Sequence, residues 1–129
     1  MSIPATDLLA FAQALSADAN LQEAGCRAAV SRAYYAAYHD TEQWHRQLPA
    51  PGSLGVSKAT GMHAQLCARL QTPDVSLKHD LKLKSRQRGY ALRAFHDCRT
   101  KADYYLAEDV TSTEVHQAIA DAKTIISLV

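Results

Sequence analysis

The chain has 129 residues, which is the usual size of one domain. Hydrophobic residues make up 47% of the sequence and charged residues 21%, which excludes a largely disordered chain. Fourteen basic residues against thirteen acidic ones give a net charge of +1, so overall charge does not indicate a nucleic-acid-binding protein.

The predicted elements are all helical. The sequence is rich in residues that favour helices, and it lacks alternating runs of Val, Ile and Thr. Helices are expected at residues 6–17, 20–47, 59–71, 85–107 and 112–128, with a loop over 48–57 and with 77–84 left open as an extra turn or a lead-in. Short connections between them predict an all-α, antiparallel up-and-down bundle of four to five helices.

Sequence patterns also predict where these helices begin and what they bury. Thr6 is the expected N-cap of the first helix, and the segments 20–23 and 111–114 resemble capping boxes that open the second and the last. Alanines crowd the middle of the second helix, so a neighbouring helix can approach it closely. The buried stripe of the fourth helix is expected to comprise Leu92, Phe95, Ala102 and Leu106.

No sequence signal indicates secretion, membrane insertion or a disulfide framework. The first residues lack a basic segment, and no apolar run is long enough to span a membrane. Three cysteines without a Cys-x-x-Cys pair argue against disulfides and a zinc ribbon. We therefore expect one domain over residues 1–129, cytoplasmic, with reduced thiols, no membrane contact, no metal and no other cofactor.

Charge is concentrated in one block of the chain. Residues 78–101 hold eight Lys or Arg and two acids, whereas residues 102–129 hold one base and five acids. Such a block can contact phosphates, or it can be a solvated helix face that pairs with the acidic last helix. The RNA-binding candidates within it are Lys82, Lys84, Arg86, Arg88 and Arg93.

Arg32 and His39 form the pair with the clearest chemical potential. Residues seven apart on a helix point in nearly the same direction, so the two share a face with Tyr35 between them. An arginine can hold a phosphate bidentately, and a histidine can move a proton near neutral pH, which together suit metal-free phosphodiester chemistry. The structural alternative is that Arg32 pairs with an acid such as Asp103 inside the bundle and that His39 is half-buried.

Tyrosines gather on two predicted helices, at positions 34, 35 and 38 and at 104 and 105. Their rings and hydroxyls suit a buried polar and aromatic cluster rather than a stacking platform for bases. The cluster is expected to comprise Tyr34, Tyr35, Arg99, Asp103 and Tyr104. His63 and Cys67 lie four residues apart and could offer two metal ligands, but no second pair is evident, so a structural or surface role is favoured for them.

Two segments resemble the HEPN superfamily, most closely its small prokaryotic members. Residues 31–39 read SRAYYAAYH, similar to the SRxYYA segment of those proteins, and residues 99–104 read RTKADY, similar to their RxxADY segment. The stretch 58–66, which includes His63, is similar to the segment that lies between them. The resemblance covers roughly residues 20–127.

The resemblance implies a four- or five-helix bundle that forms a homodimer. It also implies a metal-independent endoribonuclease of a toxin–antitoxin or phage-defence system that cleaves an RNA substrate. Members with this activity carry an Arg and a His that are separated by four to six residues. Six residues separate Arg32 from His39. Arg32 would then orient the phosphate and His39 would be the catalytic acid and base.

The same resemblance leaves a second interpretation open. Arg32 can be the structural arginine of the SRxYYA segment, with Arg99 and Asp103 as its partners in the bundle. The protein would then be a non-catalytic binding module for a cognate antitoxin or a nucleotidyltransferase-fold protein. In some relatives that companion enzyme modifies a tyrosine two residues after the histidine, and this position is Thr41 here.

Overall fold

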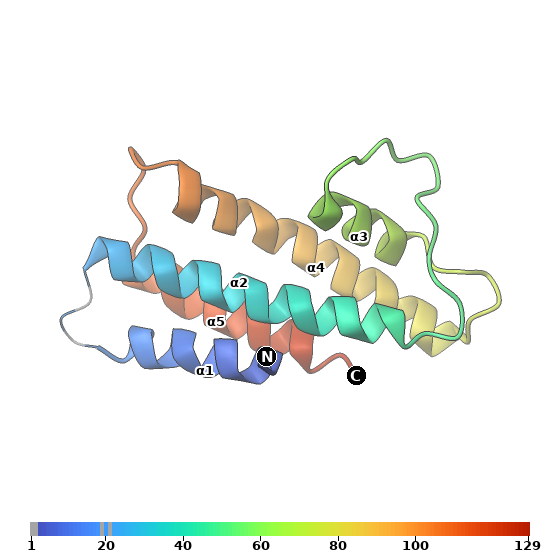
Figure 1. Ribbon diagram of the computed structural model, residues 1–129, viewed down its shortest axis with the longest axis horizontal. Helices are drawn as coiled ribbons and strands as arrows, with labels where there is room; N and C mark the ends of the chain where they lie inside the picture. Colours follow the sequence, from blue (N-terminus) through green and yellow to red (C-terminus); the bar gives the residue numbers. More distant parts are fainter. Residues whose placement is uncertain (1–2, 19, 21) are drawn as a thin grey trace.

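The computed structural model describes residues 3–18, 20 and 22–129, and within them the chain folds into an all-helical bundle. The helices are α1 (Ala5–Ser16), α2 (Glu23–Arg46), α3 (Met62–Gln71), α4 (His79–Tyr104) and α5 (Ser112–Ile126). Figure 1 shows α1, α2, α4 and α5 alternating in direction along the long axis of the bundle, with α3 lying against α4. The predicted all-α bundle is confirmed. None of the helices in the described part of the chain is long and apolar enough to cross a membrane.

Helix α2 is the centre of the bundle, and small side chains are the reason. Ala29, Ala33, Ala36 and Ala37 are completely buried, so α1, α4 and α5 all pack against α2. Tyr34 fills the core beside them and meets Phe95 of α4 edge to face, with ring centroids 5.4 Å apart. The alanines predicted that neighbouring helices can approach α2 closely, and this prediction is confirmed.

The ends of α1 and α2 differ from the sequence expectation. Pro4 rather than Thr6 is the N-cap of α1, so Thr6 lies inside the first turn. Helix α2 begins at Glu23 after Gln22, and the backbone N–H of Asn20 instead donates to the Asp18 carboxylate at 2.9 Å. Asn20 therefore belongs to the connection because its backbone is engaged in a turn. Leu21, within the expected capping box, lies outside the described residues.

The later helix boundaries divide into confirmed and corrected positions. The Thr111 hydroxyl accepts the backbone N–H of Glu114 at 3.3 Å, so the predicted cap of α5 is confirmed. Helix α4 begins at His79, so most of the segment 77–84, which the sequence left open, is helical, and the helix ends at Tyr104 rather than 107. Leu106 consequently falls in the turn after α4 and is 75% exposed, so its predicted place in the buried stripe is wrong.

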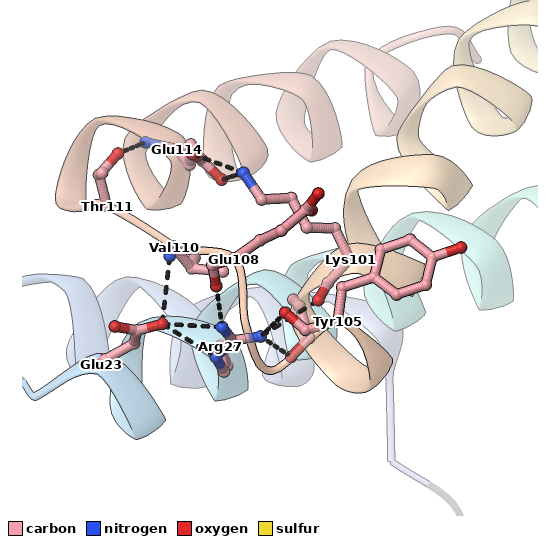
Figure 2. Close-up of polar contacts among 9 residues, drawn as sticks. Glu23, Arg27, Lys101, Tyr105, Glu108, Val110, Thr111 and Glu114 are labelled. Carbon is pink, nitrogen blue, oxygen red and sulfur yellow. Dashed lines mark hydrogen bonds and ion pairs between the residues drawn. The ribbon is translucent and has the colours of Figure 1, made fainter.

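Arg27 of α2 closes the end of α4 (Figure 2). Its guanidinium donates to the carbonyl oxygens of Lys101, Ala102 and Tyr105, at 3.1, 2.9 and 3.3 Å, and also to that of Glu108. The last carbonyls of a helix lack intrahelical partners and carry partial negative charge, so a cation here satisfies both needs. These hydrogen bonds, which we call the Arg27 clasp, explain why α4 stops before Leu106.

Charged side chains extend the same clasp to α5. The Glu23 carboxylate pairs with Arg27 at 2.8 Å and accepts the backbone N–H of Val110 at 3.3 Å. Its hydrogen bond with Arg27 holds the pKa of Glu23 below its ordinary value. Lys101 in turn pairs with Glu114 at 3.0 Å, as Figure 2 shows. The start of α2, the end of α4 and the start of α5 are thereby held together.

Candidate functional site

Arg32 and His39 both lie on the exposed side of α2. Arg32 makes no hydrogen bond or ion pair within the described residues. The His39 ring lies beside Tyr35, with centroids 6.0 Å apart and 26° between the planes, and beside Tyr38 at 5.3 Å. Because seven residues make nearly two helical turns, the two side chains share one face of α2.

The acid expected to neutralise Arg32 is engaged elsewhere. The Asp103 carboxylate forms an ion pair with Arg99, with Nε and Oδ2 2.8 Å apart, one turn away on the same helix. The Ser31 hydroxyl donates to the same oxygen at 3.4 Å. The interpretation in which Arg32 pairs with Asp103 inside the bundle is therefore wrong, because Arg99 takes that acid and Arg32 faces solvent.

Arg99 organises most of the predicted polar and aromatic cluster. Its Nη2 donates to the Tyr35 hydroxyl at 2.8 Å. Its guanidinium carbon lies 5.3 Å from the Tyr35 ring centroid and 5.5 Å from that of Tyr104, which are cation–π distances. Tyr104 is 64% exposed, so it closes the cluster from outside rather than within the core. The structure thus brings Tyr35, Arg99, Asp103 and Tyr104 together, and Tyr35 also lies beside His39.

His63 is a functional candidate for which the sequence favoured a structural or surface role. It lies in the first turn of α3, and its ring stacks on Tyr38 with centroids 4.1 Å apart and 22° between planes. Its Nδ1 lies 2.7 Å from the Tyr34 hydroxyl. Burial is the main cause that lowers the pKa of His63 from its ordinary value, and the charges of His96, Arg99 and His39 lower it further. The charge of Glu42 raises this pKa, but it does not offset the other effects. The ring is therefore neutral at neutral pH.

The hydrogen bond to Tyr34 determines which ring nitrogen of His63 carries the proton. Burial raises the pKa of Tyr34, so its phenol stays protonated. Within the described chain the hydroxyl has His63 as its partner, and a buried O–H is satisfied by donating. With Nδ1 accepting this proton, the free ring nitrogen of His63 is Nε2–H, a donor. The sequence held one signal for a functional role of His63, because the stretch 58–66 is part of the resemblance described above.

The basic block divides into exposed residues and one buried residue. Arg86 and Arg93, seven residues apart, are exposed, and Lys82 and Lys84 are half-buried. Arg88 is 1% exposed, so its predicted place on an RNA track is corrected. A buried guanidinium that is already paired cannot reach a phosphate in solvent.

The partners of Arg88 account for its burial. Its Nη1 donates to the Asp40 carboxylate at 3.0 Å and to the Thr41 hydroxyl at 2.9 Å. Its Nε donates to the backbone carbonyl of Leu128 at 2.9 Å. The guanidinium also lies over the Trp44 ring, 5.0 Å from the centroid. Arg88 therefore ties α4 to α2 and to the end of the described chain.

A pocket of about 410 Å³ opens beside His63, between residues 54–59, α3 and α4. Its polar wall includes His63, His96 and Arg93, and Cys67 also lines it. Burial raises the pKa of the Cys67 thiol to about 11, against the Arg93 charge, so the thiol stays protonated and is a poor nucleophile. No group of three His, Cys, Asp or Glu side chains placed to bind a metal occurs among the residues that the structure describes.

Comparisons of this chain with protein-family models, with curated proteins and with solved structures find no significant match.

Proposed function

We propose that this protein is a HEPN-like, metal-independent endoribonuclease of a toxin–antitoxin or phage-defence system. One observation carries the proposal: Arg32 is exposed, has no counter-ion in the described structure, and shares its helix face with the exposed His39. An arginine without an internal partner is free to bind a phosphate. A histidine at the surface is free to exchange protons with substrate.

The reaction that these groups suit is internal transesterification of RNA. The ribose 2′-oxygen forms a bond to the adjacent phosphorus as its proton passes to His39, and the bond from phosphorus to the 5′-oxygen breaks. The leaving 5′-oxygen takes up a proton from a second acid, which a second copy of His39 in a homodimer would supply. Arg32 holds the phosphate and offsets the charge that develops on its oxygens. The products are a 2′,3′-cyclic phosphate and a 5′-hydroxyl.

Neighbouring residues support the site in two ways. Tyr35 stands beside His39 and is itself fixed by Arg99, so the imidazole has a rigid surface to rest on. Arg93 lines the pocket next to His63, whose ring stacks on Tyr38, a neighbour of His39. A cation is therefore placed near the site, where it can contact the RNA backbone.

The proposal is tested by RNA cleavage in excess EDTA with matched variants. Arg32→Ala and His39→Ala should each abolish cleavage. Lys123→Ala and His116→Ala change exposed residues of α5, seven positions apart like the pair on α2, and should leave cleavage intact. Cleavage that survives His39→Ala would reject the assignment.

A second function is favoured by a different surface. Tyr104 at the end of α4 is 64% exposed, and Tyr105 and Leu106, in the turn that the Arg27 clasp holds, are 55% and 75% exposed. A rigid apolar turn suits contact with a protein. On this interpretation the protein is a non-catalytic module for an antitoxin or a nucleotidyltransferase-fold partner, and it would co-purify with that partner without cleaving RNA.

A further inference from the structure

The pocket beside His63 has the dimensions and composition of a small-molecule site. Its volume of about 410 Å³ lies within the range of ligand pockets in proteins. Apolar side chains from the preceding loop and from α3 form one part of its wall, including Leu54, Val56, Ala64 and Ala68. The remaining wall carries histidine, arginine, aspartate, amide and hydroxyl groups, so the pocket combines an apolar side with a polar one.

Gln71 is the unusual polar group in this wall. Its amide nitrogen is shielded from solvent and has no hydrogen-bond partner in the described structure. Leaving a shielded N–H unbonded costs about 1–3 kcal/mol, so such a group usually has a missing partner. The end of α3 is held close to α4 here, because Gly89 has no side chain to collide with Leu70 or Gln71. Gln71 lines the pocket at this contact between the two helices.

The other polar groups of the wall also favour an acceptor-rich ligand. The free nitrogen of His63 is a donor because Nδ1 is taken by Tyr34. The ring centroids of His96 and His63 lie 5.7 Å apart, and Arg93 adds a positive charge to the wall. Asp97 is the acid in the lining, and it can accept from a ribose hydroxyl.

Adenine meets these requirements better than the other bases do. Its ring carries three unprotonated nitrogens as acceptors and a single amino group as donor. A glutamine amide pairs bidentately with its N6 and N7, and a histidine ring can stack on a base. Guanine and the pyrimidines present more donors or fewer ring acceptors to this wall.

The pocket adjoins the proposed catalytic pair. The centroid of the Tyr38 ring lies 4.1 Å from that of His63, which lines the pocket, and 5.3 Å from that of His39. Thus one aromatic ring separates the pocket wall from the residue that would move the proton. We propose that this pocket binds an adenine base of the RNA next to the cleaved bond, an inference that rests on the proposed ribonuclease function.

Titration of the purified protein with AMP tests the pocket without requiring cleavage. Binding is followed by calorimetry and by shifts of backbone and glutamine side-chain amide signals in NMR spectra. We expect AMP to shift signals of the pocket residues and to bind roughly tenfold more tightly than ribose 5-phosphate or UMP. Equal binding of AMP and ribose 5-phosphate, or no shift at the pocket, would overturn the inference.

Variants then locate the binding. Gln71→Leu removes an amide that lacks a partner, so the fold should be retained while AMP binding weakens about tenfold. Ala68→Leu fills the pocket and should have the same effect. Gln87→Leu and Ala120→Leu make the same changes at exposed helical positions and should bind AMP like the wild type. Unaltered AMP affinity in both pocket variants would also overturn the inference.

Cleavage of short RNAs with a single A, G, C or U next to each bond separates the two proposals. Adenine preference that is lost in Gln71→Leu, with cleavage itself retained, supports both. Binding of AMP in the pocket without any RNA cleavage supports the pocket and rejects the ribonuclease. Cleavage without adenine preference, in both the wild type and Gln71→Leu, rejects the pocket and keeps the ribonuclease.

Discussion

Replacing Arg88 by methionine would remove a buried cation while keeping a side chain of similar length. The guanidinium is 1% exposed and bonds to Asp40, Thr41 and the Leu128 carbonyl. In Arg88→Met all of these groups lose their donor. Asp40 keeps 28% of its side chain exposed and can be rehydrated, whereas Thr41 is fully buried and cannot.

The expected loss of stability follows from these environments. Removing one partner of a buried ion pair costs about 3–5 kcal/mol when the other charge stays buried. The exposure of Asp40 places this variant near the lower end, and the unbonded Thr41 hydroxyl adds about 1–3 kcal/mol. We expect a total near 4 kcal/mol, which lowers the melting temperature of a domain of this size by roughly 10–20 °C.

Urea denaturation followed by circular dichroism measures this difference. Arg86→Met is the matched control, because Arg86 is exposed on the same helix. It should change the free energy of unfolding by less than about 0.5 kcal/mol. If the two variants unfold within 1 kcal/mol of each other, the buried role of Arg88 is refuted.

Three further predictions concern the loop after α2 and the Arg99 cluster. Gly52→Ala places a Cβ against the carbonyl oxygen of Arg69 and should destabilise the fold by about 1–3 kcal/mol, whereas Gly61→Ala meets no atom and should be nearly neutral by the same urea assay. His45 accepts the Gly52 N–H at 3.1 Å, and burial, followed by the Arg69 charge, lowers its pKa from 6.5. The unfolded chain therefore takes up this proton first, and stability should fall as pH drops below 6.5, by at most about 1.4 kcal/mol per pH unit for this group. In His45→Gln the pH slope should be smaller, and an unchanged slope would contradict the assignment. Tyr35→Phe deletes the acceptor of Arg99 and should cost about 1 kcal/mol in urea, while no loss would mean that this bond is not formed in solution.

Features that depend on neighbouring positions in the chain were predictable from the sequence. Helical periodicity correctly placed Leu92, Phe95 and Ala102 in the core, and the Thr111 cap required only its own first turn. The alanines of α2 predicted close packing because side-chain size is a local property. These signals suffice to predict an all-α bundle.

Features that depend on distant residues were not predictable in the same way. Arg88 belongs by sequence to a run of basic residues, yet its partners Thr41 and Leu128 lie 47 and 40 positions away. Arg27 ends α4 from a separate helix, so local propensity extended α4 past Tyr104. The meeting of His63 with Tyr34 likewise joins residues 29 positions apart.

Cleavage of a structured RNA in excess EDTA by the wild type, Arg32→Ala and His39→Ala is the decisive test of the proposed ribonuclease activity. All three proteins should unfold at similar urea concentrations, because both side chains are exposed. We expect the wild type alone to cut the RNA, leaving a 2′,3′-cyclic phosphate. Equal cleavage by the folded His39→Ala variant, or no cleavage by the wild type on any of several RNAs, would contradict the proposed function.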